Sequence, residues 1–241
     1  MMTGGLISMP LLVLHIASGF VALLSGLVAM SSRKAGTGRH AQAGNYYYLS
    51  MSLMTVSAAI LTLWEPDRLT LGAAIWTFYL VHTSRSAALN RSGQVDASWR
   101  WTLPLGMLAT AVFMHGGWVA LSEPKQEFQG MSAVAFFVFG SGALLSLLFD
   151  LSLFWRARLT QRQRIARHLW RMVAAYFLAV TSLFLGQQDD VFPFMAGSPV
   201  LLLPSIFTLV FLIFWIVRVR FARNWLGATA PRTGGVAAVG N

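Results

Sequence analysis

The chain alternates between long apolar stretches and short connections that carry nearly all of its charge. Seven stretches approach the roughly 20 apolar residues that a helix needs to cross the hydrocarbon core of a bilayer. They lie at residues 9–30, 46–64, 69–89, 101–121, 131–155, 169–186 and 200–217. The stretches lack the apolar–polar alternation of barrel strands, and an open strand edge is not stable in lipid. The pattern therefore predicts an all-α fold, a polytopic transmembrane bundle of about seven helices.

The connections differ in charge in a regular order. Those that follow odd-numbered stretches are basic, and the densest of them, 156–171, holds six arginines. Those that follow even-numbered stretches are acidic or mixed, with Glu65 and Asp67, Glu123 and Glu127, or Asp189 and Asp190. Basic loops beside membrane segments stay on the cytoplasmic side. The charges thus predict an N-terminus outside and a C-terminus inside.

Composition supports a membrane protein over a soluble one. Apolar residues make up 56% of the 241 residues and charged residues only 11%, whereas soluble domains carry about 25% charged residues. The net charge of +10 comes from residues between the apolar stretches, so it indicates topology and contacts with anionic lipids, not a nucleic-acid surface. We expect one transmembrane domain at 1–226, in an inner membrane, followed by a Gly- and Ala-rich disordered tail at 227–241.

Two absences narrow the chemistry. The chain has no cysteine, which excludes disulfides, thiolate metal sites, covalently attached haem and iron–sulfur clusters. It also has no GxGxxG or GxxxxGK[ST] motif for binding nucleotide phosphates. Any bound metal must be held by histidine, methionine or oxygen ligands. Whether the chain is an enzyme is open at this stage.

Five histidines carry most of the chemical information. With the predicted topology, His15 and His115 lie in the outer half of the membrane, and His40, His82 and His168 lie toward its inner face. Ionisable groups at membrane depth are costly and usually face a cavity, a partner or a cofactor. The depth of these side chains therefore suggests a functional role.

The sharpest hypothesis is haem b held between pairs of histidines, one haem near each face. The outer pair would be His15 with His115, and the inner pair His82 with His168. Such ligation requires two imidazoles from facing helices with small residues beneath the porphyrin. The small residues that follow His15 in the first stretch fit this requirement. The hypothesis predicts transmembrane electron transfer with a redox partner or quinone.

A plainer interpretation gives the histidines no cofactor. Small residues are also the ordinary means by which membrane helices pack closely, and each imidazole can form a hydrogen bond across helices. The protein would then be a non-catalytic transport or assembly component.

A third hypothesis places zinc at the inner face. Asp150, near the inner end of its helix, could approach His40, His82 or His168, and three histidines with one aspartate supply the nitrogen and oxygen ligands of a catalytic zinc site, which keeps a position for water. The protein would then be an intramembrane hydrolase. There is no HExxH motif, so these ligands would have to converge from separate helices. The alternative is that Asp150 forms an ion pair with Arg167 or Arg171.

A short sequence pattern, called the internal echo below, occurs twice in the chain, at residues 39–48 and 167–176. Arg39-His40 precedes Tyr48, and Arg167-His168 precedes Tyr176, with eight residues from His to Tyr in both cases. This spacing places both side chains on about the same helix face, two turns apart. The echo indicates either a duplication or two helix starts built alike.

Two segments carry a resemblance to known proteins. The run His15-Ile16-Ala17-Ser18-Gly19 with Arg39-His40 resembles the start of an uncharacterised bacterial multi-pass membrane family, a DUF2306-like domain of unknown function. His168-Leu169-Trp170-Arg171-Met172 is similar to an H-x-x-R-M motif of the same proteins. The resemblance implies a fold in a bacterial inner membrane but no reaction. Histidines on successive helices also resemble, distantly, the cytochrome b561 group. That group has six helices with paired ligands on its central four, so the seventh stretch departs from it.

Overall fold

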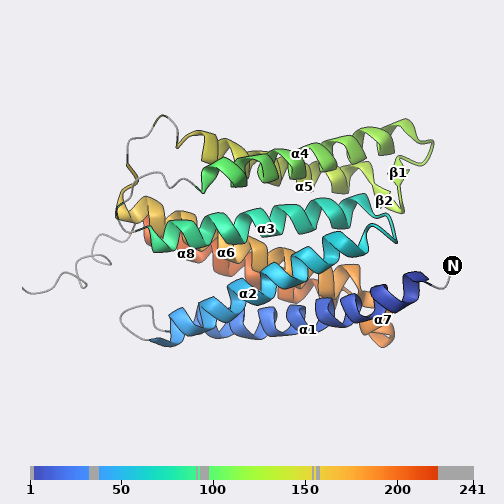
Figure 1. Cartoon of the computed structure of the whole chain (residues 1–241), viewed down its shortest axis with the longest axis horizontal. Coiled ribbons are helices and arrows are strands. Elements are labelled where there is room, and N and C mark those ends of the chain that lie inside the picture. Colours follow the sequence, from blue (N-terminus) through green and yellow to red (C-terminus); the bar gives the residue numbers. More distant parts are fainter. Residues whose placement is uncertain are drawn as a thin grey trace, which may run out of the picture.

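The fold is an all-α bundle built from long helices that run side by side (Figure 1). The computed structural model describes residues 3–32, 38–90, 92, 98–153, 155 and 158–221. The long helices in this part of the chain are α1 (Thr3–Ser31), α2 (Gly38–Leu61), α3 (Arg68–Leu89), α4 (Trp99–Ser122), α5 (Ala133–Leu151), α6 (Gln161–Thr181) and α8 (Leu203–Phe221). The predicted tail at 227–241 lies outside the described residues.

Short elements connect the long helices at one end of the bundle. An antiparallel pair, β1 (Glu127–Phe128) and β2 (Met131–Ser132), joins α4 to α5. A π-helical turn at Ser182–Gly186 extends α6. The chain then passes through the short α7 (Gln188–Val191) and the 3₁₀ turns Pro193–Met195 and Pro199–Leu202. These short elements were not predicted from the sequence, because hydropathy identifies long apolar segments and not short polar connections.

Each predicted apolar stretch falls on one long helix, but three of the helices begin at least six residues earlier than expected, among them α1, which begins at Thr3 and not at residue 9. Helix α2 begins at Gly38, not at residue 46, and α6 begins at Gln161, not at residue 169. Hydropathy marks only the apolar part of a helix, whereas backbone hydrogen bonding continues through polar turns. The start of α6 is marked by a capping box, which Thr160 and Gln163 form. His40 and His168 therefore lie within helices.

Helix α3 lies at the centre of the bundle. It packs against α2, α4 and α6, whereas α1 packs mainly on α2, α5 on α4, and α8 on α6. The polar side chains Thr77, Thr83 and Ser84 of α3 are consequently buried inside protein. Because α3 is surrounded by other helices, its polar side chains face protein and not lipid.

Five helical segments are long and apolar enough to cross a membrane, counted over the described residues. They are Ser8–Ser31, Arg100–Ser122, Ala133–Leu151, Gln161–Gly186 and Pro199–Phe221. Helices α2 and α3 do not meet this measure because they carry the polar residues that face their neighbours. The five segments indicate an integral membrane protein.

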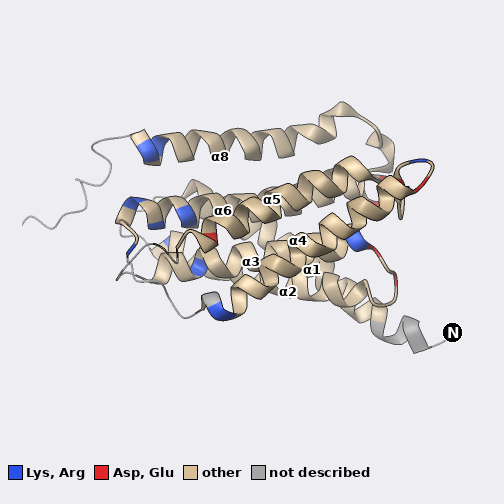
Figure 2. Cartoon of the chain, turned by 90° about the horizontal axis from the view of Figure 1, so that it is seen from above, with Lys and Arg blue, Asp and Glu red and all other residues tan. Residues whose placement is uncertain are grey.

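The charges separate along the bundle axis. Lys and Arg gather mainly at one end, together with the C-terminal end of α8, and Asp and Glu gather mainly at the opposite end (Figure 2). Asp150 is an exception, because it lies one residue before the end of α5, where the neighbouring charges are basic. The separation matches the alternation of charge seen along the sequence.

Candidate functional site

The two histidines expected in the outer half lie on helices that are not neighbours. Nδ1 of His15, on α1, lies 2.9 Å from the carbonyl oxygen of Met54 on α2. His115 is exposed on α4, which packs on α3 and α5 (Figure 1). The structure therefore does not bring His15 and His115 together.

His82 uses both ring nitrogens within a cluster of aromatic side chains. The Tyr48 hydroxyl donates to Nδ1 at 3.1 Å, and Nε2 lies 3.3 Å from Ser52 Oγ. Because the Ser52 hydroxyl donates its proton to the Tyr48 carbonyl, Ser52 Oγ accepts the proton of Nε2. The rings of Phe78 and Trp101 also contact the imidazole. Among the described residues, no ring contact joins His82 to His168.

His168 instead lies beside His40. The two ring centroids are 6.4 Å apart and the ring planes are inclined at 86°. These two histidines are the residues that begin the internal echo. The pair joins α2 to α6, two helices that are distant in sequence.

Both rings of the His40–His168 pair are held through Nδ1. Nδ1 of His40 donates to the Ala29 carbonyl at 2.9 Å. Nδ1 of His168 donates to Ser84 Oγ at 3.0 Å, because the Ser84 hydroxyl gives its own proton to the His168 carbonyl. When Nδ1 of a neutral imidazole carries the proton, Nε2 carries the lone pair that can bind a metal. Histidines that bind metals are commonly fixed in this way by a second group.

The pair borders a cavity of about 110 Å³ that is partly open. The lining comes from the basic ends of α1, α2, α6 and α8 and is mainly apolar. It consists of Gly26, Ala29, Met30, His40, Gly44, Tyr47, Ile165, His168, Leu169, Met172, Val173, Tyr176, Phe211 and Val219. A Cβ at Gly44 would meet nothing within 4 Å, so the absence of a side chain there leaves this part of the cavity open.

Two tyrosines close the inner wall of the cavity. The rings of Tyr47 and Tyr176 lie 6.3 Å apart, and their hydroxyls donate to the carbonyls of Met172 and Leu23. A Cβ at Gly26 would come within 2.7 Å of Tyr176 and 3.0 Å of Tyr47, so only glycine lets both rings approach α1. His40 and Tyr47 of α2 therefore line the same cavity as His168 and Tyr176 of α6. Tyr48, the tyrosine eight residues after His40, is not part of this lining and contacts His82.

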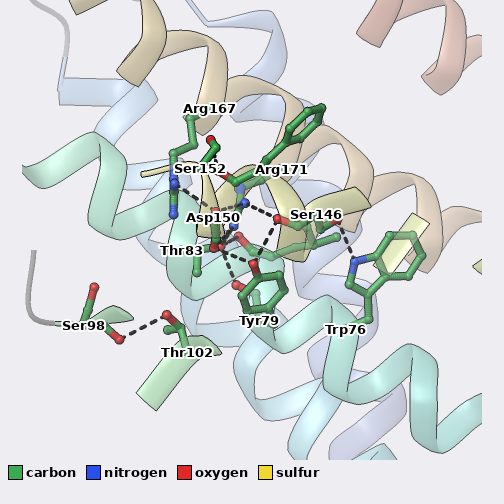
Figure 3. A network of polar contacts seen from close by, with 12 residues as sticks. Trp76, Tyr79, Thr83, Ser98, Thr102, Ser146, Asp150, Ser152, Arg167 and Arg171 are labelled. Atoms are coloured by element: carbon green, nitrogen blue, oxygen red, sulfur yellow. Dashed lines mark hydrogen bonds and ion pairs between the residues drawn. The ribbon is translucent and has the colours of Figure 1, made fainter. Parts of the chain in front are cut away.

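A buried charge cluster lies beside this site, between α3, α5 and α6 (Figure 3). The guanidinium of Arg171, which is 0% exposed, pairs with both carboxylate oxygens of Asp150. Arg167 Nη1 lies 2.9 Å from Asp150 Oδ1. The predicted ion pair between Asp150 and Arg167 or Arg171 is confirmed, and both arginines take part.

Side chains from α3 and α5 complete the cluster. The Tyr79 hydroxyl donates to Asp150 Oδ2 at 2.5 Å. Arg171 also donates to Thr83 Oγ1 and to the Ser146 carbonyl. The indole of Trp76 donates to Ser146 Oγ at 3.2 Å. The sequence reading missed these partners because tyrosine, threonine and serine are common on membrane helices, and only packing selects the ones that matter.

The zinc hypothesis required Asp150 to converge with the inner histidines His40, His82 and His168. Asp150 accepts from Arg167, Arg171 and Tyr79, so its oxygens are engaged in the cluster. The described residues contain no group of three or more His, Cys, Asp or Glu that could hold a metal ion. Among the residues that the structure describes, the ring contacts between histidines are limited to the His40–His168 pair.

Comparisons with known protein families, with curated proteins and with solved structures found no match to this chain.

The cluster generates a stability prediction. Asp150→Asn removes the carboxylate charge while Arg171 stays fully buried, and breaking a buried pair in this way typically costs about 3–5 kcal/mol. We expect a clear fall in the thermal unfolding temperature of the detergent-solubilised protein, followed by tryptophan fluorescence. Asp190→Asn, at an exposed position of α7, is the matched control and should change little. Equal unfolding temperatures for the two variants would contradict the assignment.

Proposed function

We propose that this protein is a haem b protein of the bacterial inner membrane, in which His40 and His168 are the two axial ligands. Seven membrane spans, with the N-terminus outside and the C-terminus inside, would place this pair at the cytoplasmic face. The separation of charge along the bundle supports that orientation (Figure 2). The five apolar segments support the membrane location.

The separation of the two rings carries the proposal. Two imidazoles on opposite sides of one iron place their centroids about 6 Å apart, since each metal–nitrogen bond is about 2 Å and each nitrogen lies about 1 Å from its ring centroid. The His40 and His168 centroids are 6.4 Å apart. Nδ1 of both rings is bonded within the protein, which favours Nε2 as the ligand atom.

The lining of the cavity beside the pair is mainly apolar, as the surroundings of a porphyrin would be. Gly26, Ala29 and Gly44 line the cavity with little side-chain volume, and aromatic side chains border it. The cavity volume of about 110 Å³ is smaller than the 300–1,000 Å³ typical of cofactor pockets. The cavity as the structure has it is therefore too small for a whole porphyrin. Helix α8 supplies Phe211 and Val219 to the lining and packs mainly on α6.

The proposed ligand pair differs from the pairs expected from sequence. His168 keeps its role, but His40 takes the place of His82, whose two nitrogens are bonded to Tyr48 and Ser52. A bound haem would supply reversible one-electron transfer. With one pair at the cytoplasmic end, the protein would exchange electrons with a partner or quinone in that half of the membrane.

The ligand assignment is tested by absorption spectroscopy. Protein expressed with supplied haem precursor and purified in detergent should show a Soret band and the visible bands of six-coordinate low-spin haem. His40→Ala and His168→Ala should each lose the six-coordinate spectrum because one axial nitrogen is removed. His115→Ala, at an exposed position of α4, should keep it. A colourless wild-type protein, or a full spectrum in His40→Ala, would refute the assignment.

A second variant tests the cavity instead of the ligands. Gly44→Leu would place a side chain in the space that lies open beside the pair, and glycine replacement within a helix is not itself destabilising. We expect folded protein with strongly reduced haem content, measured as haem per polypeptide. Ala41→Leu, exposed on the same helix, should bind haem like the wild type. Normal haem content in Gly44→Leu would show that the group binds elsewhere.

A second candidate function is a non-catalytic transport or assembly component with structural histidines. One observation favours it: His15, His40, His82 and His168 all have hydrogen-bond partners within the protein. The absorption spectrum separates the two candidates, because structural histidines bind no haem.

The proposed orientation is tested by reporter fusions. Alkaline phosphatase is active only outside the cytoplasm, so a fusion after Arg100 should be inactive and a fusion near Gln126 should be active. The opposite activities would invert the membrane sides and place the His40–His168 pair at the outer face.

A further inference from the structure

Helix α4 carries a histidine on a face that no other helix covers. The helix lies at the edge of the bundle and packs on α3 and α5 (Figure 1). His115 is exposed on its free face, and among the residues that the structure describes it forms no hydrogen bond, ion pair or ring contact. The other four histidines all have hydrogen-bond partners within the protein. His115 therefore differs from them in having its polar atoms unpaired.

His115 lies at membrane depth. Helix α4 has 24 residues and is about 36 Å long, a little more than the roughly 30 Å of hydrocarbon that it has to cross. His115 is seven residues, or about 10 Å, from the end of the helix at Ser122, too far for an imidazole to reach the headgroups. An unpaired donor and acceptor in hydrocarbon are costly, and such groups usually pair with another protein group.

The rest of this face has the spacing of a helix–helix contact. Exposed residues recur at alternating intervals of three and four, at Leu108, Ala111, His115 and Trp118, and we call these four residues the α4 seam. This spacing is that of the seam between two helices that cross with a left-handed twist, the commonest packing of membrane helices. Ala111 is small enough for a second backbone to approach, and Trp118, which is 71% exposed, offers a large contact surface.

We propose that the α4 seam binds the same seam of a second copy of this chain, in a two-fold dimer. Two copies inserted the same way in one membrane have parallel α4 helices, so a two-fold axis places each seam residue opposite its own counterpart. His115 then meets His115 of the partner subunit. A neutral imidazole has one N–H donor and one bare nitrogen, so one ring donates to the other. The seam is thus complementary to itself, as hydrocarbon is not.

The dimer does not depend on the haem proposal. Helix α4 contributes no residue to the lining of the cavity beside His40 and His168. The contact surface and the cavity therefore lie on different helices, and each can be tested without the other.

Crosslinking tests whether the two seams meet. The chain has no cysteine, so one introduced cysteine reports contacts between copies without background. Ala111→Cys, oxidised in native membranes, should form a disulfide-linked dimer, because facing seam positions bring two Cα atoms within about 7 Å. Val210→Cys is the matched control, since Val210 is 59% exposed in the middle of α8, a helix that packs mainly on α6. It should stay monomeric.

The contribution of His115 is tested by energy transfer between labelled copies in liposomes, followed as lipid is added. His115→Leu should raise the dissociation constant of the dimer about tenfold, because the hydrogen bond between the imidazoles is lost. His115→Gln has both a donor and an acceptor and should associate nearly as well as the wild type.

Three outcomes would overturn the proposal. A monomeric wild-type protein, with no crosslink in Ala111→Cys, leaves the α4 seam to lipid or to a different protein. Equal crosslinking of Ala111→Cys and Val210→Cys means that the copies collide at random. Equal association of the wild type and His115→Leu removes the hydrogen bond on which the choice of a second copy rests. The haem spectrum is unaffected by any of these results, so the proposed function stands or falls separately.

Discussion

The arrangement of the site depends on the burial of Arg171 against Asp150. A fully buried guanidinium is stable only where its charge and its hydrogen-bond donors are satisfied. Asp150 from α5, with Thr83 from α3, satisfies most of them. This requirement fixes the rotation of α6 about its own axis. Once that rotation is fixed, His168 lies on the neighbouring face, toward the cavity and His40.

The same constraint explains how a strongly basic segment becomes part of the bundle. The N-terminal half of α6 carries several arginines that a reading of hydropathy places outside the membrane. In the structure the helix continues through them, because Arg167 and Arg171 pair with Asp150 on α5 and Arg164 donates to the carbonyl of Asn90, just after the end of α3. The basic residues thus belong to the packing of the protein, and two of them lie beside a histidine of the cavity.

Hydropathy and charge were sufficient to predict the helices and the all-α class, because burial in lipid demands long apolar segments whatever their partners. The ion pair of Asp150 was also predictable, since a lone carboxylate among arginines has few other partners. The histidine pairs depend on which helices are neighbours, and sequence gave no means of ranking them. The central position of α3 keeps α1 and α4 apart, which separates His15 from His115. The repeated Arg-His start, which indicated only a duplication or two similar helix starts, was the sequence feature that His40 and His168 share.

The proposed haem would be held by His40 and His168, whose ring planes are inclined at 86°. Electron paramagnetic resonance of the oxidised protein tests this most directly, because nearly perpendicular imidazole planes give a highly anisotropic low-spin signal, unlike parallel planes. We predict such a signal in the wild type and its loss in His40→Ala. A high-spin signal, or the absence of any haem signal from folded, haem-supplied protein, would contradict the account.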